Sequence, residues 1–270
     1  MDASDLAKRM KRYETVSKTT LVTRMPVILR IDGKAFHTLT RGFQKPFDRV
    51  LNLSMMETMR FLCKNIQGCV LGYTQSDEIT LVLVDYKKLT SNPWFDYEVQ
   101  KMCSVGASMA TVGFNNAFSR HVEEFSIHGG GSPLYARYLN ALEDGAMFDC
   151  RAFNVPREEV TNNIYWRQLD ASRNSIQMLG QVHFAHKELQ NKSCNEIQDM
   201  LMTRKGINWN NLPVYQKRGS CCVKRKYFEE QEEDGKLVKV ERSHWEVDVN
   251  IPIFKGDGRE YIEQLLEPEE

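Results

Sequence analysis

The spacing of apolar residues in the first 65 positions predicts a strand followed by a helix. A short apolar, β-branched run covers residues 26–32 and ends at Asp32-Gly33, as expected for a buried strand. From residue 46 to residue 65 the apolar positions recur at nearly 3.6-residue intervals, and Pro46 suits the first turn of a helix. A basic segment that resembles the start of an amphipathic helix precedes both elements.

The next stretch predicts a hairpin, a second helix and a further strand. Two apolar runs, 69–74 and 79–84, flank the polar residues 75–78, which form the tip of an antiparallel hairpin. A helix follows over 96–118, and residues 147–155 alternate like another strand. Strand, helix, hairpin, helix, strand is the βαββαβ order of a ferredoxin-like sheet with helices on one face, so we expect an α+β fold.

Beyond residue 155 the pattern changes to helices and one long hairpin. A helix is predicted over 156–180, and a capping box at Ser193 opens another that Gly206 closes. Residues 212–215 begin an extended region, and 223–229 pair with 237–247 in a hairpin that turns at Asp234-Gly235. No linker separates the two halves. We therefore expect a catalytic core over 1–155, which includes the N-terminal helix, and an extension over 156–270 that packs on it.

Composition and charge exclude several classes of protein. Of the 270 residues 41% are hydrophobic and 27% are charged, which is typical of a globular chain. No apolar run approaches the roughly 18 residues of a membrane helix, and the N-terminal segment lacks the apolar core of a secretory signal. Seven cysteines without paired Cys-x-x-Cys spacing indicate reduced thiols. We expect a cytoplasmic protein that does not associate with membranes.

Because the chain has 36 Lys and Arg against 36 Asp and Glu, any contact with nucleic acid has to come from a local basic patch. One such patch lies in the predicted C-terminal hairpin and the residues before it, and an acidic tract follows it directly. A solvated hairpin surface would explain the same residues. The patch consists of Lys217, Arg218, Lys224, Arg225 and Lys226.

The predicted topology brings the end of the first strand beside the tip of the central hairpin, so Asp32 and Asp77 become neighbours. Two converging carboxylates and the backbone carbonyl of Gly33 are oxygen ligands that suit Mg²⁺. Two such ions can activate an attacking hydroxyl and neutralise a leaving pyrophosphate. The chain contains no P-loop, no dinucleotide-binding glycine motif and no esterase nucleophile elbow, which argues against those classes of enzyme.

Five segments resemble the tRNA-His guanylyltransferases and, most closely, the guanylyltransferase-like 3′-5′ polymerases of bacteria, archaea and phages. They occur in the order found in that family and span most of the chain. They are RIDGKAFH (30–37), QKPFD (44–48), GYTQSDE (72–78), YWRQ (165–168) and LPVY (212–215).

The resemblance implies a polymerase-like palm in which Asp32, Asp77 and the Gly33 carbonyl hold two Mg²⁺ ions, with Glu78 as a third catalytic acid. The loop after the first strand would cradle a nucleoside triphosphate through backbone N–H groups, and other side chains would contact its base and phosphates. The implied nucleotide-binding residues are Arg30, Lys34, Ala35, Phe36, His37, Lys45, Asp48, Ser76 and Lys101. The implied partners are tRNA, ATP and GTP, and the implied assembly is a homotetramer.

The implied reaction activates a tRNA 5′ end with ATP or GTP, after which the 3′-hydroxyl of an incoming nucleotide attacks it. Where eukaryotic members carry a His-Ile-Asn-Asn-Leu-Tyr-Asn motif, this chain has residues 172–178, of which only Asn174 matches clearly. This departure favours template-directed repair of 5′-truncated tRNA. A dedicated enzyme that adds one G to tRNA-His, a nucleotidyl cyclase and a non-catalytic tRNA-binding protein are the alternatives.

Overall fold

The protein is described by a computed structural model over residues 4–233 and 236–269. Within these residues six strands form one sheet. The strands are β1 (Val27–Gly33), β2 (Cys69–Gln75), β3 (Glu78–Leu83), β4 (Phe148–Asn154), β5 (Ser220–Glu233) and β6 (Lys236–Asp248). The longer helices are α1 (Asp5–Val16), α3 (Arg49–Asn65), α4 (Val99–Gly129), α5 (Pro133–Asp144), α6 (Arg157–His183) and α8 (Cys194–Lys205). Short helices are α2 (Phe36–Leu39), α7 (His186–Leu189), α9 (Val214–Arg218) and α10 (Glu260–Glu263).

The strand order β4-β1-β3-β2-β5-β6 contains the predicted palm as its first four strands, and every pairing is antiparallel. The C-terminal hairpin extends this sheet, because β5 pairs with β2 from Thr74↔Ser220 to Leu71↔Val223. The predicted turn at Asp234-Gly235 lies outside the described residues. The segment expected to be extended at 212–215 instead leads into α9, and the strand begins after Gly219.

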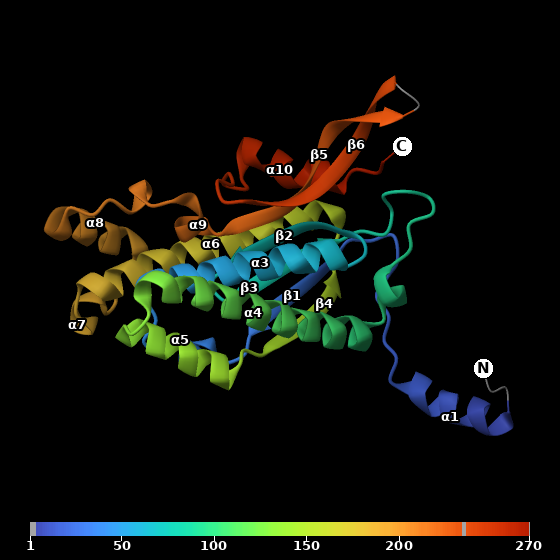
Figure 1. Ribbon diagram of the computed structural model, residues 1–270, viewed down its shortest axis with the longest axis horizontal. Coiled ribbons are helices and arrows are strands. Elements are labelled where there is room, and N and C mark those ends of the chain that lie inside the picture. The colour runs from blue at the N-terminus through green and yellow to red at the C-terminus, as the bar shows by residue number, and fades with distance from the viewer. Residues whose placement is uncertain (1–3, 234–235, 270) are drawn as a thin grey trace.

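Helices cover both faces of the sheet (Figure 1). The palm helices α3 and α4 pack on one face, as predicted, around a core that includes Leu29, Met59 and Phe114. Helix α6 of the extension and the C-terminal segment cover the other face, around Ile28 and Ile164. The extension therefore completes the two-sided burial of the palm sheet.

Helix α4 is longer than the sequence pattern predicts, and α5 was not predicted. Apolar side chains continue along α4 as far as Phe125, whose ring lies 5.1 Å from that of Tyr138 in α5. Helix α4 ends at the glycine run 129–131, and Ser132 then caps α5 by accepting a hydrogen bond from the Tyr135 N–H. The two helices form an antiparallel pair that the spacing in 96–118 alone does not reveal.

Helix α1 lies apart from the rest of the chain in Figure 1 and buries none of its residues. An extended segment that includes a single bridge between Thr20 and Glu98 connects it to the palm. Among the described residues, no helix has the length and apolar character needed to cross a bilayer.

Candidate active site at the end of the central strands

The structure brings the end of β1 beside the turn between β2 and β3, as the topology predicts. Asp32 stands directly opposite Glu78 in the antiparallel pair of β1 and β3. The next residue, Gly33, donates its N–H to the backbone carbonyl of Asp77 at 3.0 Å. Opposed residues of an antiparallel pair project from the same face, so Asp32 and Glu78 both lie on the face that α6 covers.

The Asp77 carboxyl lies in an environment that disfavours its charge. Burial raises its pKa, a hydrogen bond from the Ser76 side chain opposes this shift, and the negative charges of Asp32 and Glu78 add to it. The pKa is therefore above the ordinary value of an aspartate. A cation at this position would offset both the repulsion and the loss of solvation.

The donors at this edge fit magnesium bound together with a phosphate. Asp32 and Asp77 supply carboxylate oxygens, and the Gly33 carbonyl is a further oxygen donor within one residue of the pair. In the described part of the chain no group of three or more acidic, imidazole or thiol side chains is assembled to enclose an ion. Mg²⁺ is commonly held by one or two carboxylates, with water and substrate phosphates completing its shell, so this sparse set suits a shared metal site.

Glu78 does not face this edge as a free acid. Its carboxylate accepts hydrogen bonds from Arg167, at 2.6 Å to Oε1 and 2.9 Å to Oε2, and from Arg30 at 3.0 Å to Oε2. The side chain is only 4% exposed. Its oxygens are thus saturated by two guanidiniums, which places Glu78 and Arg30 together in one ion-pair network.

Arg167 is the residue of this network that the sequence did not assign. It is 5% exposed and also binds Asp170 at 2.9 Å. Its position within the YWRQ segment marks it as part of the family pattern, but its partner lies 89 residues away in the sequence. Asp149 on β4 stands opposite Asp32, but its side chain is 56% exposed and pairs with Arg151 at 3.6 Å.

The loop after β1 is shaped by a glycine and a left-handed residue. A Cβ on Gly33 would lie 2.3 Å from the Phe36 ring, so no larger residue fits there. Ala35 adopts φ 55° and precedes α2, whose first residue, Phe36, is buried against Phe114 and Phe148. The N–H groups at the start of a helix lack intrahelical acceptors. Lys34 and His37 are exposed on the same loop.

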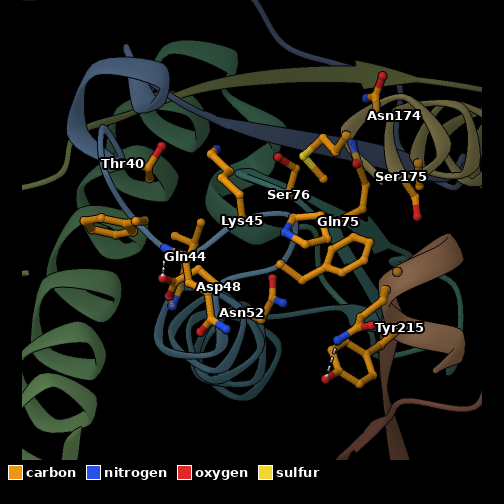
Figure 2. Close-up of a pocket in the computed structure, with 18 of the residues that line it drawn as sticks. Thr40, Gln44, Lys45, Asp48, Asn52, Gln75, Ser76, Asn174, Ser175 and Tyr215 are labelled. Atoms are coloured by element: carbon orange, nitrogen blue, oxygen red, sulfur yellow. Dashed lines mark hydrogen bonds between the residues drawn. The ribbon is translucent and has the colours of Figure 1, made fainter. Parts of the chain in front are cut away.

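A cavity of about 270 Å³ lies beside the Asp77 turn. Figure 2 shows that the loop before α3, the turn after β2 and helix α6 all contribute side chains to it. The predicted contacts Lys45, Asp48 and Ser76 line it. Seven carboxamide side chains contribute to its wall: Gln44, Asn52, Gln75, Asn174, Gln177, Gln181 and Gln216.

Within this cavity Asp48 is already engaged by the protein. It caps α3 by accepting the Leu51 N–H at 2.9 Å, and it also accepts the Gln44 N–H at 2.9 Å and the Tyr138 hydroxyl at 2.7 Å. The side chain is 5% exposed. Asp48 therefore shapes the cavity wall, whereas Lys45 and Ser76 are exposed and accessible to a ligand.

The structure does not bring Lys101 to this site. Gly106 of α4 lies beside Cys150, which stands opposite Ile31 on β1. Lys101 precedes Gly106 by more than one helical turn, near the start of α4, where its ammonium lies 4.7 Å from the centre of the Phe95 ring.

The basic patch of the extension is smaller than the sequence predicts. Lys217 is buried and donates to the Asn210 carbonyl at 2.6 Å, and burial lowers its pKa. Lys226 pairs with Glu241 at 3.1 Å across the hairpin, and Arg225 lies 3.9 Å from Glu246. The ammonium of Lys217 is therefore not at the surface of the predicted patch, and acids on β6 offset the charges of Arg225 and Lys226. Lys224 is exposed and Arg218 is half-buried.

Comparisons with known proteins relate the chain to one family. A model of the tRNA(His) guanylyltransferase family matches residues 7–156. The tRNA(His) guanylyltransferase of Schizosaccharomyces pombe is 27% identical over 277 residues, covering 96% of this chain and 97% of that protein. A bacterial tRNA(His) guanylyltransferase-like protein solved in complex with ATP superposes with a TM-score of 0.79 at 44% identity, covering 97% and 99% of the two chains. A second such structure, in complex with GTP, has a TM-score of 0.74 at 41% identity, with the same coverage of the two chains.

The family match covers more than half of the chain and includes Asp32, Asp77 and the loop between β1 and α2. The solved structures extend the likeness over the C-terminal hairpin. The chain therefore belongs to the tRNA(His) guanylyltransferase family and is a guanylyltransferase-like nucleotidyltransferase.

Proposed function

We propose that the protein adds nucleotides in the 3′-5′ direction to the 5′ end of tRNA, and that its main task is template-directed repair of 5′-truncated tRNA. The observation that carries the proposal is the meeting of Asp32 and Asp77 beside a cavity rich in carboxamide groups. A carboxylate pair suits transfer between phosphates, and carboxamides suit hydrogen bonding to base edges. The similar bacterial protein is described in complexes with ATP and with GTP, which supports these nucleotides as ligands here.

In this proposal Asp32, Asp77 and the Gly33 carbonyl would hold two Mg²⁺ ions. When bound, these ions lower the pKa of an attacking hydroxyl and neutralise charge on the leaving group. The chain's own residues would position the reactants. The N–H groups of 35–37 would face the triphosphate, because the Lys34 N–H already donates to the Met147 carbonyl at 2.8 Å. Lys45 and Ser76 line the cavity that would receive the base and phosphates. Phosphoryl transfer depends mainly on positioning and charge neutralisation, so no protein nucleophile is required.

Two observations favour repair over single G addition. Residues 172–178 depart from the eukaryotic motif, and the bacterial guanylyltransferase-like protein shares 44% identity with this chain. Single G addition remains the second candidate, since the fission yeast enzyme aligns along 96% of the chain. We expect a homotetramer on the family resemblance, which light scattering of the purified protein tests directly.

The decisive experiment incubates the protein with Mg²⁺, ATP, labelled GTP and two tRNAs, one truncated at its 5′ end and one intact tRNA-His. Repair predicts incorporation that is limited to positions opposite a template base. Single G addition predicts one residue on tRNA-His only. A cyclic nucleotide product, or bound tRNA that stays unchanged, would contradict the proposal.

Two variants connect the reaction to the site. Asp32→Ala is expected to abolish incorporation, because it removes a metal-binding carboxylate. Asp149→Asn is the matched control, because it removes one negative charge from β4 at the position directly opposite Asp32. This variant should retain most of the activity.

A further inference from the structure

Trp166 is a large aromatic side chain left exposed beside the candidate active site. It lies on α6 and is 53% exposed. Full burial of such a ring would stabilise the fold, so an indole that the fold leaves half in water is available for a contact outside the protein. No other residue of the network around Glu78 is as exposed to solvent and as apolar.

Two arginines hold the indole in place. The Cζ atom of Arg167 lies 4.5 Å from the centre of the ring and that of Arg30 lies 5.7 Å from it. Both guanidiniums are fixed by the same carboxylate, that of Glu78. Both guanidiniums therefore connect the ring to Glu78, and cation–π attraction holds the indole against them.

The ring is also close to the predicted metal site. Arg30 and Asp32 project from the same face of β1 two residues apart, a separation of roughly 7 Å along a strand. Arg151 stands opposite Arg30 on the edge strand β4; its side chain is 60% exposed and lies 3.6 Å from the carboxylate of Asp149 in a solvent-exposed pair. The surface beside Asp32 and Asp77 thus combines a fixed aromatic ring with an exposed guanidinium, which is the pairing that single-stranded nucleic acid binds.

We propose that Trp166 is a stacking platform for the base of the 5′-terminal nucleotide of the RNA. Stacking on the ring would hold that nucleotide so that its 5′ phosphate lies at Asp32 and Asp77, while Arg151 faces the backbone. Stacking tolerates every base, as an enzyme that repairs different 5′ ends requires. This inference rests on the proposed function, because it assigns the RNA end that the proposed reaction extends.

The test measures binding without nucleoside triphosphates, by anisotropy of labelled acceptor-stem RNA with a normal or an abasic 5′-terminal nucleotide. Trp166→Leu should weaken binding of the normal RNA about 5- to 150-fold, the range that loss of one stacked base predicts. Trp166→Phe should retain most of the affinity. The abasic end should weaken binding by the wild type and have little further effect on Trp166→Leu, because both changes remove the same stack.

Leu169→Ala is the matched control. It removes an exposed apolar side chain, 51% accessible, one turn along the same helix without removing a ring, and it should bind like the wild type. The inference is overturned if Leu169→Ala loses as much affinity as Trp166→Leu, or if the abasic end has the same effect in both backgrounds. It is also overturned if the wild type does not bind this RNA, or if Trp166→Leu changes the number of subunits instead of the affinity.

The two proposals fail in different ways. If the wild type extends truncated tRNA but the Trp166 variants bind normally, only the stacking inference falls. If Trp166 couples to the terminal base but no extension occurs with Mg²⁺ and nucleotides, only the proposed reaction falls.

Discussion

Arg167 and Glu78 form a contact between one side chain of the extension and one of the palm. Both groups are desolvated, and each satisfies most of the other's hydrogen bonds. Breaking a buried pair by removing one partner leaves an uncompensated charge, which costs about 3–5 kcal/mol.

We expect Arg167→Ala to lower the free energy of unfolding by that amount, toward the lower end because Arg30 still pairs with Glu78. Urea denaturation measures it. Arg173→Ala is the control: this exposed arginine pairs with Asp170, which Arg167 also binds, so its loss should change stability by about 0.5 kcal/mol or less. An equal effect of the two variants would contradict the assigned role of the buried pair.

The raised pKa of Asp77 predicts the direction in which stability and activity change with pH. A carboxyl whose pKa is higher in the folded than in the unfolded state lowers the free energy of unfolding at pH values above its folded-state pKa. This loss of stability shrinks as the pH falls below the folded-state pKa, and it is gone below the unfolded-state pKa. Asp77→Asn should therefore raise the melting temperature at neutral pH in a buffer without divalent cations, by a few degrees. The same variant should be inactive, and wild-type activity should rise with pH as Asp77 ionises.

The effect of Mg²⁺ on the melting temperature tests whether Asp77 binds the ion. Mg²⁺ should raise the melting temperature of the wild type, because it binds only the folded state, and should leave that of Asp77→Asn nearly unchanged. A magnesium-dependent shift of the same size in both proteins would show that the ion binds elsewhere.

At the scale of elements, the backbone at the end of β1 can take its conformation only because Gly33 has no side chain to meet the Phe36 ring. Gly33→Ala would force a methyl group into the Phe36 ring, which Phe114 and Phe148 hold in place. We expect a loss of about 1–3 kcal/mol of stability, typical of an overpacked core, and at least tenfold lower activity because the bond between Gly33 and Asp77 is disturbed.

Gly113→Ala in α4 is the control for this variant. Its added methyl group meets the Phe61 ring at 2.9 Å, but that side chain is 37% exposed and can move aside. Alanine also favours a helix interior, so this variant should be neutral or slightly stabilising. Thermal unfolding and the incorporation assay together separate the two cases.

Helices and strands that show a clear hydrophobic periodicity can be predicted from the sequence. The palm strands and α3 follow directly from periodicity, and the order of elements places Asp32 beside Asp77. The pairing of β5 with β2 and the contact between Arg167 and Glu78 cannot be predicted in this way, because both depend on how distant segments pack. The same limit explains Lys217: a lysine in a basic run looks free until the fold buries its ammonium against Asn210.

At the scale of the whole molecule, the formal net charge is zero, so the proposed RNA binding would depend on local cations such as the exposed Lys224 and the half-buried Arg218. We expect Arg218→Ala and Lys224→Ala each to weaken tRNA binding and to reduce the slope of log affinity against log salt by about one. Filter binding over a range of salt concentrations measures this slope. Lys226→Ala, whose charge Glu241 already offsets, is the control and should change the slope less. Unchanged slopes for the first two variants would exclude the hairpin from RNA contact.

The continuous sheet has a mechanical consequence. The ladder between β2 and β5 reaches Thr74↔Ser220, three residues before Asp77, and β5 continues outward into the projecting hairpin with β6 (Figure 1). A load applied to the outer hairpin is transmitted along backbone hydrogen bonds to the turn that carries Asp77. We expect any partner bound to the outer hairpin to be held at a fixed position relative to Asp77, because paired strands rather than a flexible hinge span the distance between the two.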